Sequence, residues 1–330
     1  MEPRPFERPH FVVNARSPQA RGSAKLDALR RTAERLFPGA AWSLTSGPGD
    51  AAALAHSAAS RGANLVVAVG GDGTINEVVN GILTARGDAP ASAPDESARV
   101  TTGVTHGKPP ALGILPAGSG SDFARSLAIP RDVAGALAVM AAGGRRRIDA
   151  GRIVCAPLDA GAASERTERF FINMGGCGAS AQVADRFNRR RIPGALGYAA
   201  ASAMTTLSYR WPEVEIRTDD GTPRTVTLNM LFACNGEYCG GGMRVGRGAS
   251  LDDGLLLVVE AAGIGRLRTM LEWPRLYGGH LARVRGVRVT SARRICVTSR
   301  EEVLVDCDGE VIGRLPAVYE IVPAAITVCA

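Results

Sequence analysis

The stretch NLVVAVGGDGTINEVVNGIL, Asn64 to Leu83, passes from a short apolar run through a glycine-rich turn into a helical pattern. The apolar run predicts a buried strand, and the spacing from Thr74 onward predicts a helix. A helix that opens directly after a glycine-rich turn presents free backbone N–H groups and the positive end of its dipole, which together favour a phosphate. Gly70 and Gly71 would let such a ligand approach the main chain closely.

Asp72 is the unusual residue of this turn, because a carboxylate repels a bare phosphate. Its presence is explained if a cation or a phosphate-accepting hydroxyl shares the site, as in phosphoryl transfer. The spacing matches neither a Walker loop, which needs GK[ST], nor the GxGxxG dinucleotide motif. The alternative is a tight strand-to-helix turn in which Asp72 only caps the helix.

Outward from this turn, strand and helix patterns alternate over the first 145 residues. Strands are expected over 10–14, 40–45, 64–69 and 110–118, and helices over 24–37, 49–62, 74–85 and 131–144. This alternation predicts an open, doubly wound parallel α/β domain over residues 1–144. Residues 86–110 are rich in Pro, Ala, Ser and Gly without periodicity, which predicts an exposed, mobile insertion.

Beyond about residue 145 the sequence favours short strands joined by turns. Strands are expected over 146–154, 169–174, 213–235, 254–262, 286–299, 303–312 and 318–328, and helices over 179–191, 196–209 and 266–277. Asp220-Gly221 and Asp308-Gly309 are typical hairpin turns. These patterns predict a mostly antiparallel, β-rich second domain over 145–330, whose C-terminal end can pack back on the first domain.

Composition narrows the class of protein. The net charge of +7 suits nucleotide phosphates, nucleic acid or an acidic membrane surface, although arginine-rich usage can equally reflect genome composition. The seven cysteines stand singly and the four histidines lie far apart, which argues against zinc and disulfides and fits a reducing cytoplasm. Neither a signal peptide nor an apolar run long enough to span a membrane is expected.

A second loop, LGILPAGSGSDFARSL (Leu112 to Leu127), repeats the strand, small-residue turn and aspartate of the first. Asp122 occupies the place of Asp72, Ser119 and Ser121 offer hydroxyls, and Arg125 offers a planar cation for phosphate. Two such loops at the carboxyl ends of parallel strands would face one crevice. Taken alone, the second loop is more often a plain turn.

Two later segments also carry carboxylates. DCDGEV, residues 306–311, is most simply a hairpin turn. The glycine-rich segment from Cys239 to Val259 is either a surface loop or backbone packed close to a ligand. Its Asp252-Asp253 pair is suited to a hard cation, but a solvated turn explains it equally well.

Taken together, these segments resemble the diacylglycerol kinase catalytic-domain family, which includes bacterial lipid kinases and sphingosine kinases. GGDGTINEVVNG, PAGSGSDFAR, GGGM followed by DDGLL, and DGE occur in the family's order, so the resemblance spans nearly the whole chain. VVNARSP and TSGPGDAAALA resemble two further family segments. GGDG alone also occurs in NAD kinases and phosphofructokinases, and the later motifs favour lipid kinases.

The resemblance implies a nucleotide-binding α/β domain and a β-rich lipid domain with ATP in the cleft between them. Glu310 would be the general base, with Asp72 as the alternative base, and Asp72 and Asp122 would support it through Mg²⁺. A structural Mg²⁺ would take the Asp253 side chain and the main-chain oxygens of Ser250 and Leu255. The implied nucleotide contacts are Asn14, Ala15, Arg16, Ser17, Pro18, Thr45, Gly70, Gly71, Asp72, Gly73, Thr74 and Ser119.

The chain departs from the family at several motif positions. Ser119 replaces a threonine and preserves its hydroxyl, whereas Ser121 replaces an asparagine and loses an amide. Ala15 and Pro18 change the first motif. Arg247 stands where proline is usual, and Leu257 replaces an aspartate. The four acidic residues implied in catalysis and metal binding are all retained.

The implied function is ATP- and Mg²⁺-dependent transfer of the γ-phosphoryl group to a lipid hydroxyl, with diacylglycerol giving phosphatidic acid as the default. The alternatives are a sphingoid base, ceramide or another lipid as acceptor, or a nucleotide-binding regulatory protein without catalysis. We expect a cytoplasmic enzyme that contacts the membrane peripherally and binds no nucleic acid; a β-sheet edge could serve a homodimer. Candidate membrane contacts are arginines at 145–147, 189–191 and 283–294 with Leu196–Tyr209, although any single cluster is more simply a solvated face.

Overall fold

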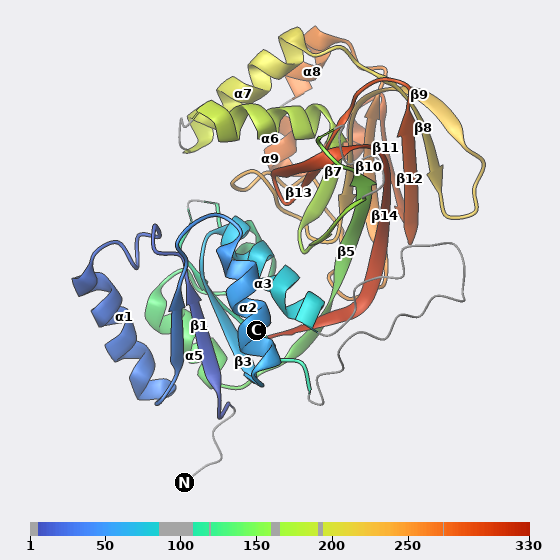
Figure 1. Cartoon of the computed structure of the whole chain (residues 1–330). Coiled ribbons are helices and arrows are strands. Elements are labelled where there is room, and N and C mark those ends of the chain that lie inside the picture. Colours follow the sequence, from blue (N-terminus) through green and yellow to red (C-terminus); the bar gives the residue numbers. More distant parts are fainter. Residues whose placement is uncertain (1–5, 86–107, 119, 160–165, 191–193, 273) are drawn as a thin grey trace. The chain divides into compact units, whose positions relative to one another are not determined.

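A computed structural model gives the fold and describes residues 6–85, 108–118, 120–159, 166–190, 194–272 and 274–330 (Figure 1). Most of the insertion expected at 86–110 lies outside the described residues. The chain divides into two compact units, Met1–Ile148 with Ala325–Ala330, and Asp149–Ala324. The last six residues therefore belong to the first unit.

The first unit is built on a parallel sheet with the strand order β14–β4–β3–β1–β2. Central strands β3 and β4 are buried along their whole length, as expected for apolar parallel strands covered on both faces. Val328 near the end of the chain pairs with Leu112 of β4. The strands are β1 (Pro9–Val13), β2 (Ala41–Leu44), β3 (Leu65–Gly70), β4 (Ala111–Pro116) and the end of β14 (Glu310–Val328).

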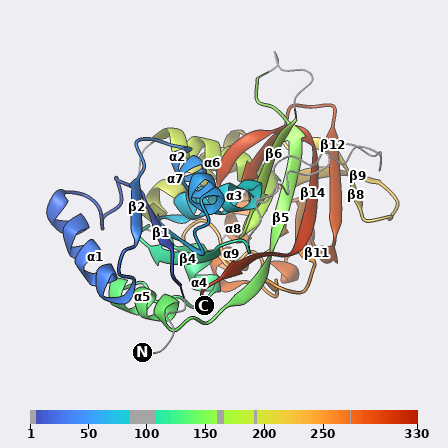
Figure 2. The same ribbon diagram turned by 60° about the horizontal axis from the view of Figure 1, so that its bottom comes forward.

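Helices cover both faces of this sheet. Helix α1 (Ser23–Leu36) packs on α5 (Val133–Ala141), and α2 (Asp50–Ser60) packs on α3 (Asp72–Ala85). Figure 2 shows the strands between these two helix pairs. Helices α2 and α3 can approach closely because residue 81 is a glycine. A Cβ atom at this position would lie 2.2 Å from the Ala52 carbonyl oxygen. The predicted doubly wound parallel architecture is confirmed.

Strand β1 marks the point where the winding direction reverses. It pairs with β2 on one side and with β3 on the other, and the chain continues from β3 to β4. Open α/β sheets bind ligands at such a switch point, outside the carboxyl ends of the strands. The loops after β1 and β3 flank this point.

The second unit is built on antiparallel strands, as predicted. Six of them close a hydrogen-bonded ring in the order β7–β13–β14–β12–β8–β9, with β9 returning to β7. Tyr319, Leu231 and Ile295 belong to the buried apolar cluster of these strands. The strands before β14 are β5 (Arg146–Ala156), β6 (Thr167–Phe171), β7 (Met174–Gly178), β8 (Glu213–Thr218), β9 (Arg224–Cys234), β10 (Leu256–Ala262), β11 (Val287–Ala292), β12 (Arg294–Ser299) and β13 (Leu304–Cys307).

The helices of this unit follow β7 and β10. Figure 1 shows α6 and α7 side by side, and α7 also contacts α8. In the part of the chain that the structure describes, no helix combines the length and the apolar character that crossing a membrane requires. The helices are α6 (Ala179–Arg190), α7 (Gly194–Ser208), α8 (Arg266–Glu272), α9 (Pro274–Gly278) and the 3₁₀ turn Leu281–Arg283, and the first unit adds the short α4 (Asp122–Ser126).

The observed elements differ from those expected in five places. The segment MGGCG forms strand β7, which was not predicted because glycine is a poor strand signal. Helix α3 begins at Asp72 and not at Thr74. The helix expected over 266–277 is two helices, the second starting at Pro274. The strand expected over 286–299 is divided at Arg293. The strand expected over 303–312 is divided into β13 and the start of β14, and the 19-residue β14 continues through the strand expected over 318–328.

Candidate active site

Predicted nucleotide contacts lie at the carboxyl ends of four neighbouring parallel strands in the first unit. The segment 14–18 follows β1, Thr45 follows β2, and the turn 70–74 spans the end of β3 and the start of α3. The loop after β4 leads into α4 and holds Ser119, which lies outside the described residues. The topology therefore brings these segments to one edge of the sheet.

Asn14 fixes the loop after β1 against the turn after β3. Its Nδ2 donates to Thr74 Oγ1 at 3.0 Å, and its backbone nitrogen donates to the Val69 carbonyl at 2.9 Å. Its side-chain oxygen accepts from the Arg16 nitrogen, and its carbonyl accepts from the Ser17 nitrogen, both at 2.9 Å. One asparagine thus sets the conformation of the segment that the sequence assigned to the nucleotide.

The Ser17 hydroxyl is buried and has no hydrogen-bond partner among the residues that the structure describes. A buried polar atom without a partner is uncommon and costs free energy unless a water or a ligand satisfies it. Thr45 completes this edge, because its Oγ1 lies 3.4 Å from the Ala15 nitrogen. The segment therefore offers a polar atom to a bound group.

The two glycine-rich loops touch backbone to backbone. A Cβ atom built on Gly118 would lie 2.6 Å from the Gly71 Cα, and one built on Gly70 would lie 2.5 Å from the Thr74 side chain. The Ala117 nitrogen also donates to the Gly70 carbonyl at 2.8 Å. Glycine is required here by close approach, and the two loops form one continuous main-chain surface.

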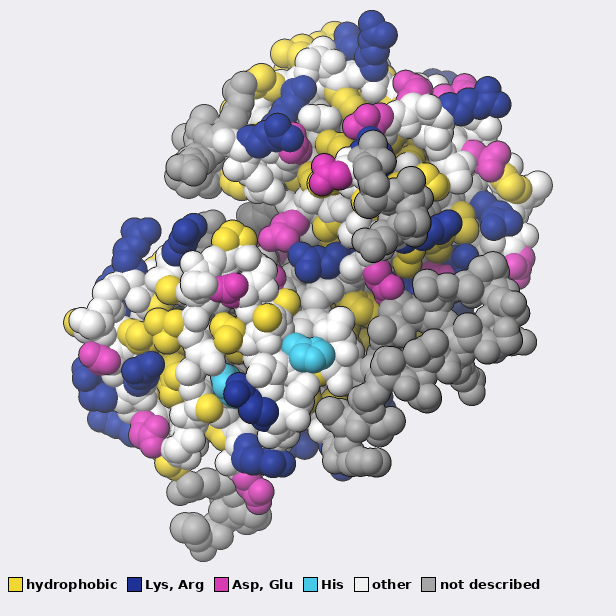
Figure 3. Space-filling view, viewed as in Figure 1, with side chains coloured by type: hydrophobic (Ala, Val, Ile, Leu, Met, Phe, Trp, Pro, Cys, Tyr) yellow, Lys and Arg dark blue, Asp and Glu magenta, His cyan; other side chains and the backbone are white. Residues whose placement is uncertain are grey.

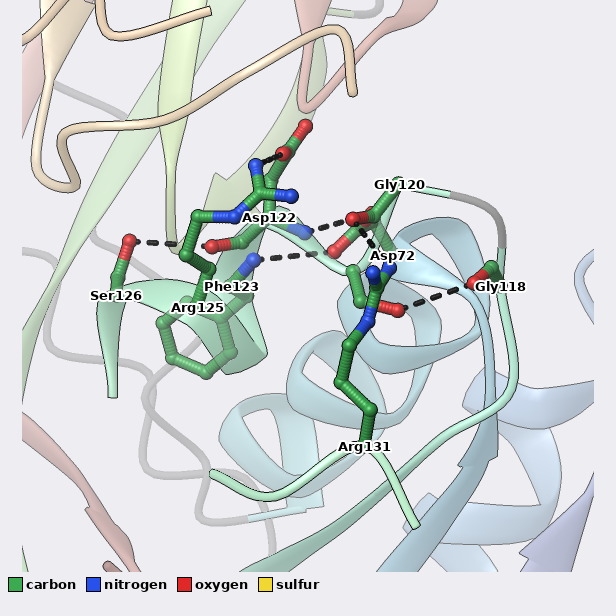
Figure 4. A network of polar contacts seen from close by, with 9 residues as sticks. Asp72, Gly118, Gly120, Asp122, Phe123, Arg125, Ser126 and Arg131 are labelled. Carbon is green, nitrogen blue, oxygen red and sulfur yellow. Dashed lines mark hydrogen bonds and ion pairs between the residues drawn. The ribbon is translucent and has the colours of Figure 1, made fainter. Parts of the chain in front are cut away.

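Asp72 joins these loops through its carboxylate (Figure 4). Oδ1 accepts from the Phe123 nitrogen at 3.1 Å, and Oδ2 accepts from the Asp122 nitrogen at 3.2 Å. These N–H groups belong to the first turn of α4, where a helix supplies no backbone acceptor of its own, so Asp72 caps a helix other than its own. The expectation that Asp72 might only cap the helix of its own turn is thereby replaced.

Asp122 and its neighbours form a compact polar cluster. Arg125 Nη1 lies 3.0 Å from Asp122 Oδ1, and the Ser121 hydroxyl donates to the Gly118 carbonyl at 3.1 Å. Arg131 Nη2 donates to the Gly120 carbonyl at 3.0 Å. Two groups that the sequence offered to a phosphate, Arg125 and Ser121, thus bind the protein itself, and Asp122 is buried beneath them.

Glu77 has a structural role that the motif did not reveal. Its two carboxylate oxygens accept from the nitrogens of Gly49 and Ala51, each at 3.0 Å, at the start of α2. Glu77 therefore does for α2 what Asp72 does for α4. The sequence indicated this role only through the position of Glu77, an acidic residue five places after Asp72 on a helix with many buried positions.

In the second unit, the DGE segment forms the turn between β13 and β14. Asp308 and Gly309 both have positive φ angles, as a tight hairpin requires, so the predicted turn is confirmed. The Asp308 carboxylate accepts from three successive backbone nitrogens, Ile172 to Met174, at 2.9 to 3.0 Å. Asp308 therefore anchors the hairpin to the start of β7.

Glu310 begins β14 directly after this turn. Its side chain is 45 % exposed, and Oε2 lies 3.5 Å from Arg169 Nη2. A partly exposed carboxylate beside one arginine is oriented yet accessible to a reactant. The geometry is compatible with the role of general base that the resemblance implied.

The DDGLL segment has few converging donors. Asp253 is exposed, and its Oδ1 accepts from the Leu255 nitrogen at 3.0 Å, while the Ser250 hydroxyl donates to Asp252. The buried Asp149, missed in the sequence as a lone acid in a strand, holds the segment by accepting from the Gly254 nitrogen at 2.7 Å. Within the described ranges, no three acidic, histidine or cysteine side chains are grouped as metal ligands.

The donor chemistry nevertheless fits Mg²⁺ better at the first unit than at DDGLL. Mg²⁺ with nucleotide phosphates usually takes one or two carboxylates and keeps several waters. Asp72 and Asp122 are joined by a hydrogen bond and stand beside the glycine loops. A carboxylate oxygen that accepts one N–H still has a lone pair for a cation.

Two adjoining apolar pockets lie within the second unit. The first is lined mainly from α6, α7 and β9, and the second mainly from β10 and residues 281–287. The residues that both pockets share are Met230, Phe232, Thr269 and Leu276.

Asp306 is a buried carboxyl that contacts a residue of the first pocket. Its Oδ1 accepts from the Ser180 hydroxyl at 2.9 Å, and Ser180 lines that pocket. Complete burial raises the pKa of Asp306 to about 7, against a smaller lowering from the Ser180 hydrogen bond. This carboxyl was not singled out in the sequence, because it lies within a strand pattern.

Comparison with known proteins follows the same division of the chain. Residues 8–153 match the model described as the diacylglycerol kinase catalytic domain, and residues 174–330 match the YegS C-terminal NAD kinase beta sandwich-like domain. A diacylglycerol kinase of Bacillus subtilis (strain 168) is 30% identical over 283 residues, covering 83% of this chain and 80% of that protein.

Other similar proteins extend this comparison. A protein named as a YegS-like lipid kinase, from Chromohalobacter salexigens, is 31% identical over 67% of this chain, but the match spans only 61% of that relative, less than two thirds. A solved structure from Bacillus anthracis str. Sterne superimposes with a TM-score of 0.73 at 22% identity, covering 98% of this chain and 97% of that one. At that identity the superposition supports the fold alone.

Proposed function

The chain belongs to the diacylglycerol kinase family of lipid kinases, and from this premise we propose that it transfers the γ-phosphoryl group of ATP to the hydroxyl of a diacylglycerol, with Mg²⁺ as cofactor. The observation that carries the proposal is the contact between the glycine-rich loops, where Gly118 packs on Gly71 and Asp72 holds α4. Main-chain N–H groups fixed in this way suit phosphates and their developing charge.

Glu310 is the proposed general base. It accepts the proton of the lipid hydroxyl while the hydroxyl oxygen forms a bond to the γ-phosphorus. The bond between that phosphorus and the β–γ bridging oxygen breaks, and ADP leaves with the electron pair. Arg169 orients the Glu310 carboxylate from 3.5 Å.

Asp72 and Asp122 are the residues proposed to hold Mg²⁺, whose charge would neutralise phosphate oxygens during the transfer. Asp72 accepts two backbone N–H groups and Asp122 is paired with Arg125. Both carboxylates are therefore fixed before a nucleotide binds. This arrangement favours Asp72 as a positioning and cation-binding group, and Glu310 as the base.

The two pockets of the second unit support an acceptor with two acyl chains. They share the lining residues Met230, Phe232, Thr269 and Leu276, and we propose that each receives one hydrocarbon chain. A diacylglycerol has two chains joined close to its hydroxyl. A sphingoid base has one long chain and would leave one apolar pocket unfilled, which is unfavourable.

The proposal is tested by incubating the protein with labelled ATP, Mg²⁺ and a lipid extract, and identifying the labelled lipid. We expect phosphatidic acid, and purified diacylglycerol should be used in preference to sphingosine or monoacylglycerol. A labelled sphingoid base would replace diacylglycerol as acceptor. Binding of ATP without any labelled lipid would favour a nucleotide-binding regulatory protein.

Glu310→Gln tests the base separately. Loss of the proton acceptor should lower kcat by about 10²- to 10⁴-fold, whereas ATP affinity and stability should change little because the side chain is partly exposed. Glu302→Gln is the control, because Glu302 is an exposed glutamate that is likewise paired with an arginine, Arg314 at 3.4 Å. A fully active Glu310→Gln protein would transfer the role of base to Asp72.

A further inference from the structure

Helix α8 exposes large apolar side chains on a structured surface. Leu267 is 74% exposed and Leu271 is 71% exposed, the highest values among the large hydrophobic residues that the structure describes. Met270 on the same helix is 36% exposed. Single exposed leucines are ordinary on soluble proteins, but three apolar residues on one short helix require an explanation.

The spacing of these residues gives α8 two faces. Successive residues of a helix advance by about 100°, so Leu267, Met270 and Leu271 fall within one arc of about 100°. Arg266 and Arg268 border this arc on either side. Thr269 faces the opposite way, is buried, and lines both apolar pockets. One face of α8 thus closes the pockets while the other presents leucines outward.

The surrounding segment is strongly basic. Residues 266–288 contain six arginines and a single acidic residue, Glu272, a net charge of +5 with His280 neutral. Arg268 and Arg275 lie 3.8 and 3.0 Å from Glu272, so the one negative charge is already paired. Figure 3 shows basic side chains beside hydrophobic ones over α7 and α8, at the top of the view.

We propose that α8 docks on an anionic lipid bilayer, with Leu267, Met270 and Leu271 entering the boundary of the acyl chains and the surrounding arginines binding headgroup phosphates. An apolar arc bordered by basic residues is typical of helices that lie in the membrane interface. Basic residues near an anionic membrane add an electrostatic attraction of several-fold each.

The proposal rests on the function proposed above and identifies the surface by which the enzyme meets its lipid. Because Thr269 of α8 and Leu276 of α9 line the pockets, a lipid leaving the bilayer at α8 would reach them directly. Of the arginines expected at 283–294 to contact the membrane, three belong to the basic segment around α8, namely Arg283, Arg285 and Arg288. The leucines of α8 were not anticipated.

A second copy of the chain is a weaker candidate for this surface. In a symmetric dimer the same patch meets itself, so two surfaces with the same excess of arginines would face each other. Such like-charge contacts oppose association. An anionic membrane satisfies the charges and the leucines together.

The test is binding to vesicles of phosphatidylcholine with phosphatidylglycerol, and of phosphatidylcholine alone, both without any acceptor lipid or ATP. Leu267→Gln/Leu271→Gln should bind the anionic vesicles about tenfold more weakly or worse. The matched control is Leu36→Gln/Leu44→Gln, which removes two exposed leucines from the first unit, 42% and 41% exposed, and should bind as the wild type does. Thermal unfolding of both variants checks their folding.

Charge is tested by Arg283→Gln/Arg285→Gln against Arg31→Gln/Arg35→Gln on α1. Only the first pair should weaken binding to anionic vesicles, and added salt should abolish the difference. The proposal would be overturned if the wild-type protein did not bind anionic vesicles, or if the leucine variant bound them normally. It would also be overturned if the leucine variant lost only self-association. Vesicle binding needs no turnover, so its result can be interpreted even if the kinase assay detects no activity.

Discussion

Asp72 Oδ1 accepts a hydrogen bond at 3.1 Å from the backbone nitrogen of Phe123, which lies 51 residues further along the chain. Asp72 Oδ2 also accepts from the Asp122 nitrogen, so the carboxylate binds two N–H groups of the first turn of α4. The carboxylate therefore holds the loop after β4 against the turn after β3. The cation proposed for this site would bind the same carboxylate. The geometry of the two loops and the negative charge of the site therefore both depend on Asp72.

Asp72→Asn should separate these two contributions. The amide retains one acceptor oxygen, so one of the two N–H groups loses its partner and the free energy of unfolding should fall by about 1 kcal/mol. ATP affinity in Mg²⁺ should fall as well, since the negative charge is lost. Urea unfolding and calorimetric titration with ATP measure the two effects.

Glu77→Gln is the matched control for this variant. Glu77 also accepts two backbone N–H groups at the start of a neighbouring helix, at 3.0 Å each, but it lies outside the loop surface. We expect a similar loss of stability with ATP affinity unchanged. Equal losses of affinity in both variants would mean that Asp72 acts on the nucleotide only through stability.

Ser17→Ala should change stability and binding in opposite directions. The buried hydroxyl has no partner among the described residues, so removing it should raise the free energy of unfolding of the nucleotide-free protein by about 1 kcal/mol. If the hydroxyl binds the nucleotide, ATP should stabilise the variant less than the wild type in thermal unfolding. Ser43→Ala, which removes a partner of His10 at 2.9 Å, should only destabilise.

Gly118→Ala tests the contact between the two glycine loops. The new Cβ atom would lie 2.6 Å from the Gly71 Cα, so one backbone must move, at a cost of about 1 to 3 kcal/mol. ATP affinity should fall because the main-chain surface is distorted. Gly47→Ala meets no atom within 4 Å and should bind ATP normally. Normal ATP affinity in Gly118→Ala would remove this surface from the site.

Much of the first unit could be predicted because its strands and helices have the periodicity of buried elements. Leu65 to Val69 is a continuous apolar run, and the structure buries all of it. A helix was expected over 131–144, and Asp132 near the start of that range caps α5 by accepting from the Gly135 nitrogen at 2.7 Å. Local patterns of this kind need no knowledge of distant residues.

Features that depend on distant contacts could not be predicted. Strand β7 consists largely of glycines because a Cβ atom at Gly175 would lie 2.5 Å from Ile153 and 3.1 Å from Tyr319. The partners of Asp72 and Glu77 belong to helices other than their own. A motif indicates that such carboxylates matter, but only the fold shows which N–H groups they bind.

Asp306 should make the stability of the second unit depend on pH. Burial raises the pKa of this carboxyl from 3.8 to about 7 in the folded protein. The folded state therefore holds a proton between about pH 4 and pH 7 that the unfolded state releases, so stability is full below this window and falls as pH rises through it. The slope contributed is at most about 1.4 kcal/mol for each pH unit.

Asp306→Asn removes this titration while leaving an oxygen to accept from the Ser180 hydroxyl. The free energy of unfolding of the variant should not fall between about pH 4 and pH 7. The variant should therefore become more stable relative to the wild type as pH rises. Urea unfolding across this range, with Asp159→Asn as an exposed control that retains the wild-type profile, measures the difference. A pH profile in Asp306→Asn that parallels the wild type would show that Asp306 ionises in the folded protein at its ordinary pKa. In that case water, or a movement of Ser180, must solvate the Asp306 carboxylate in the folded protein.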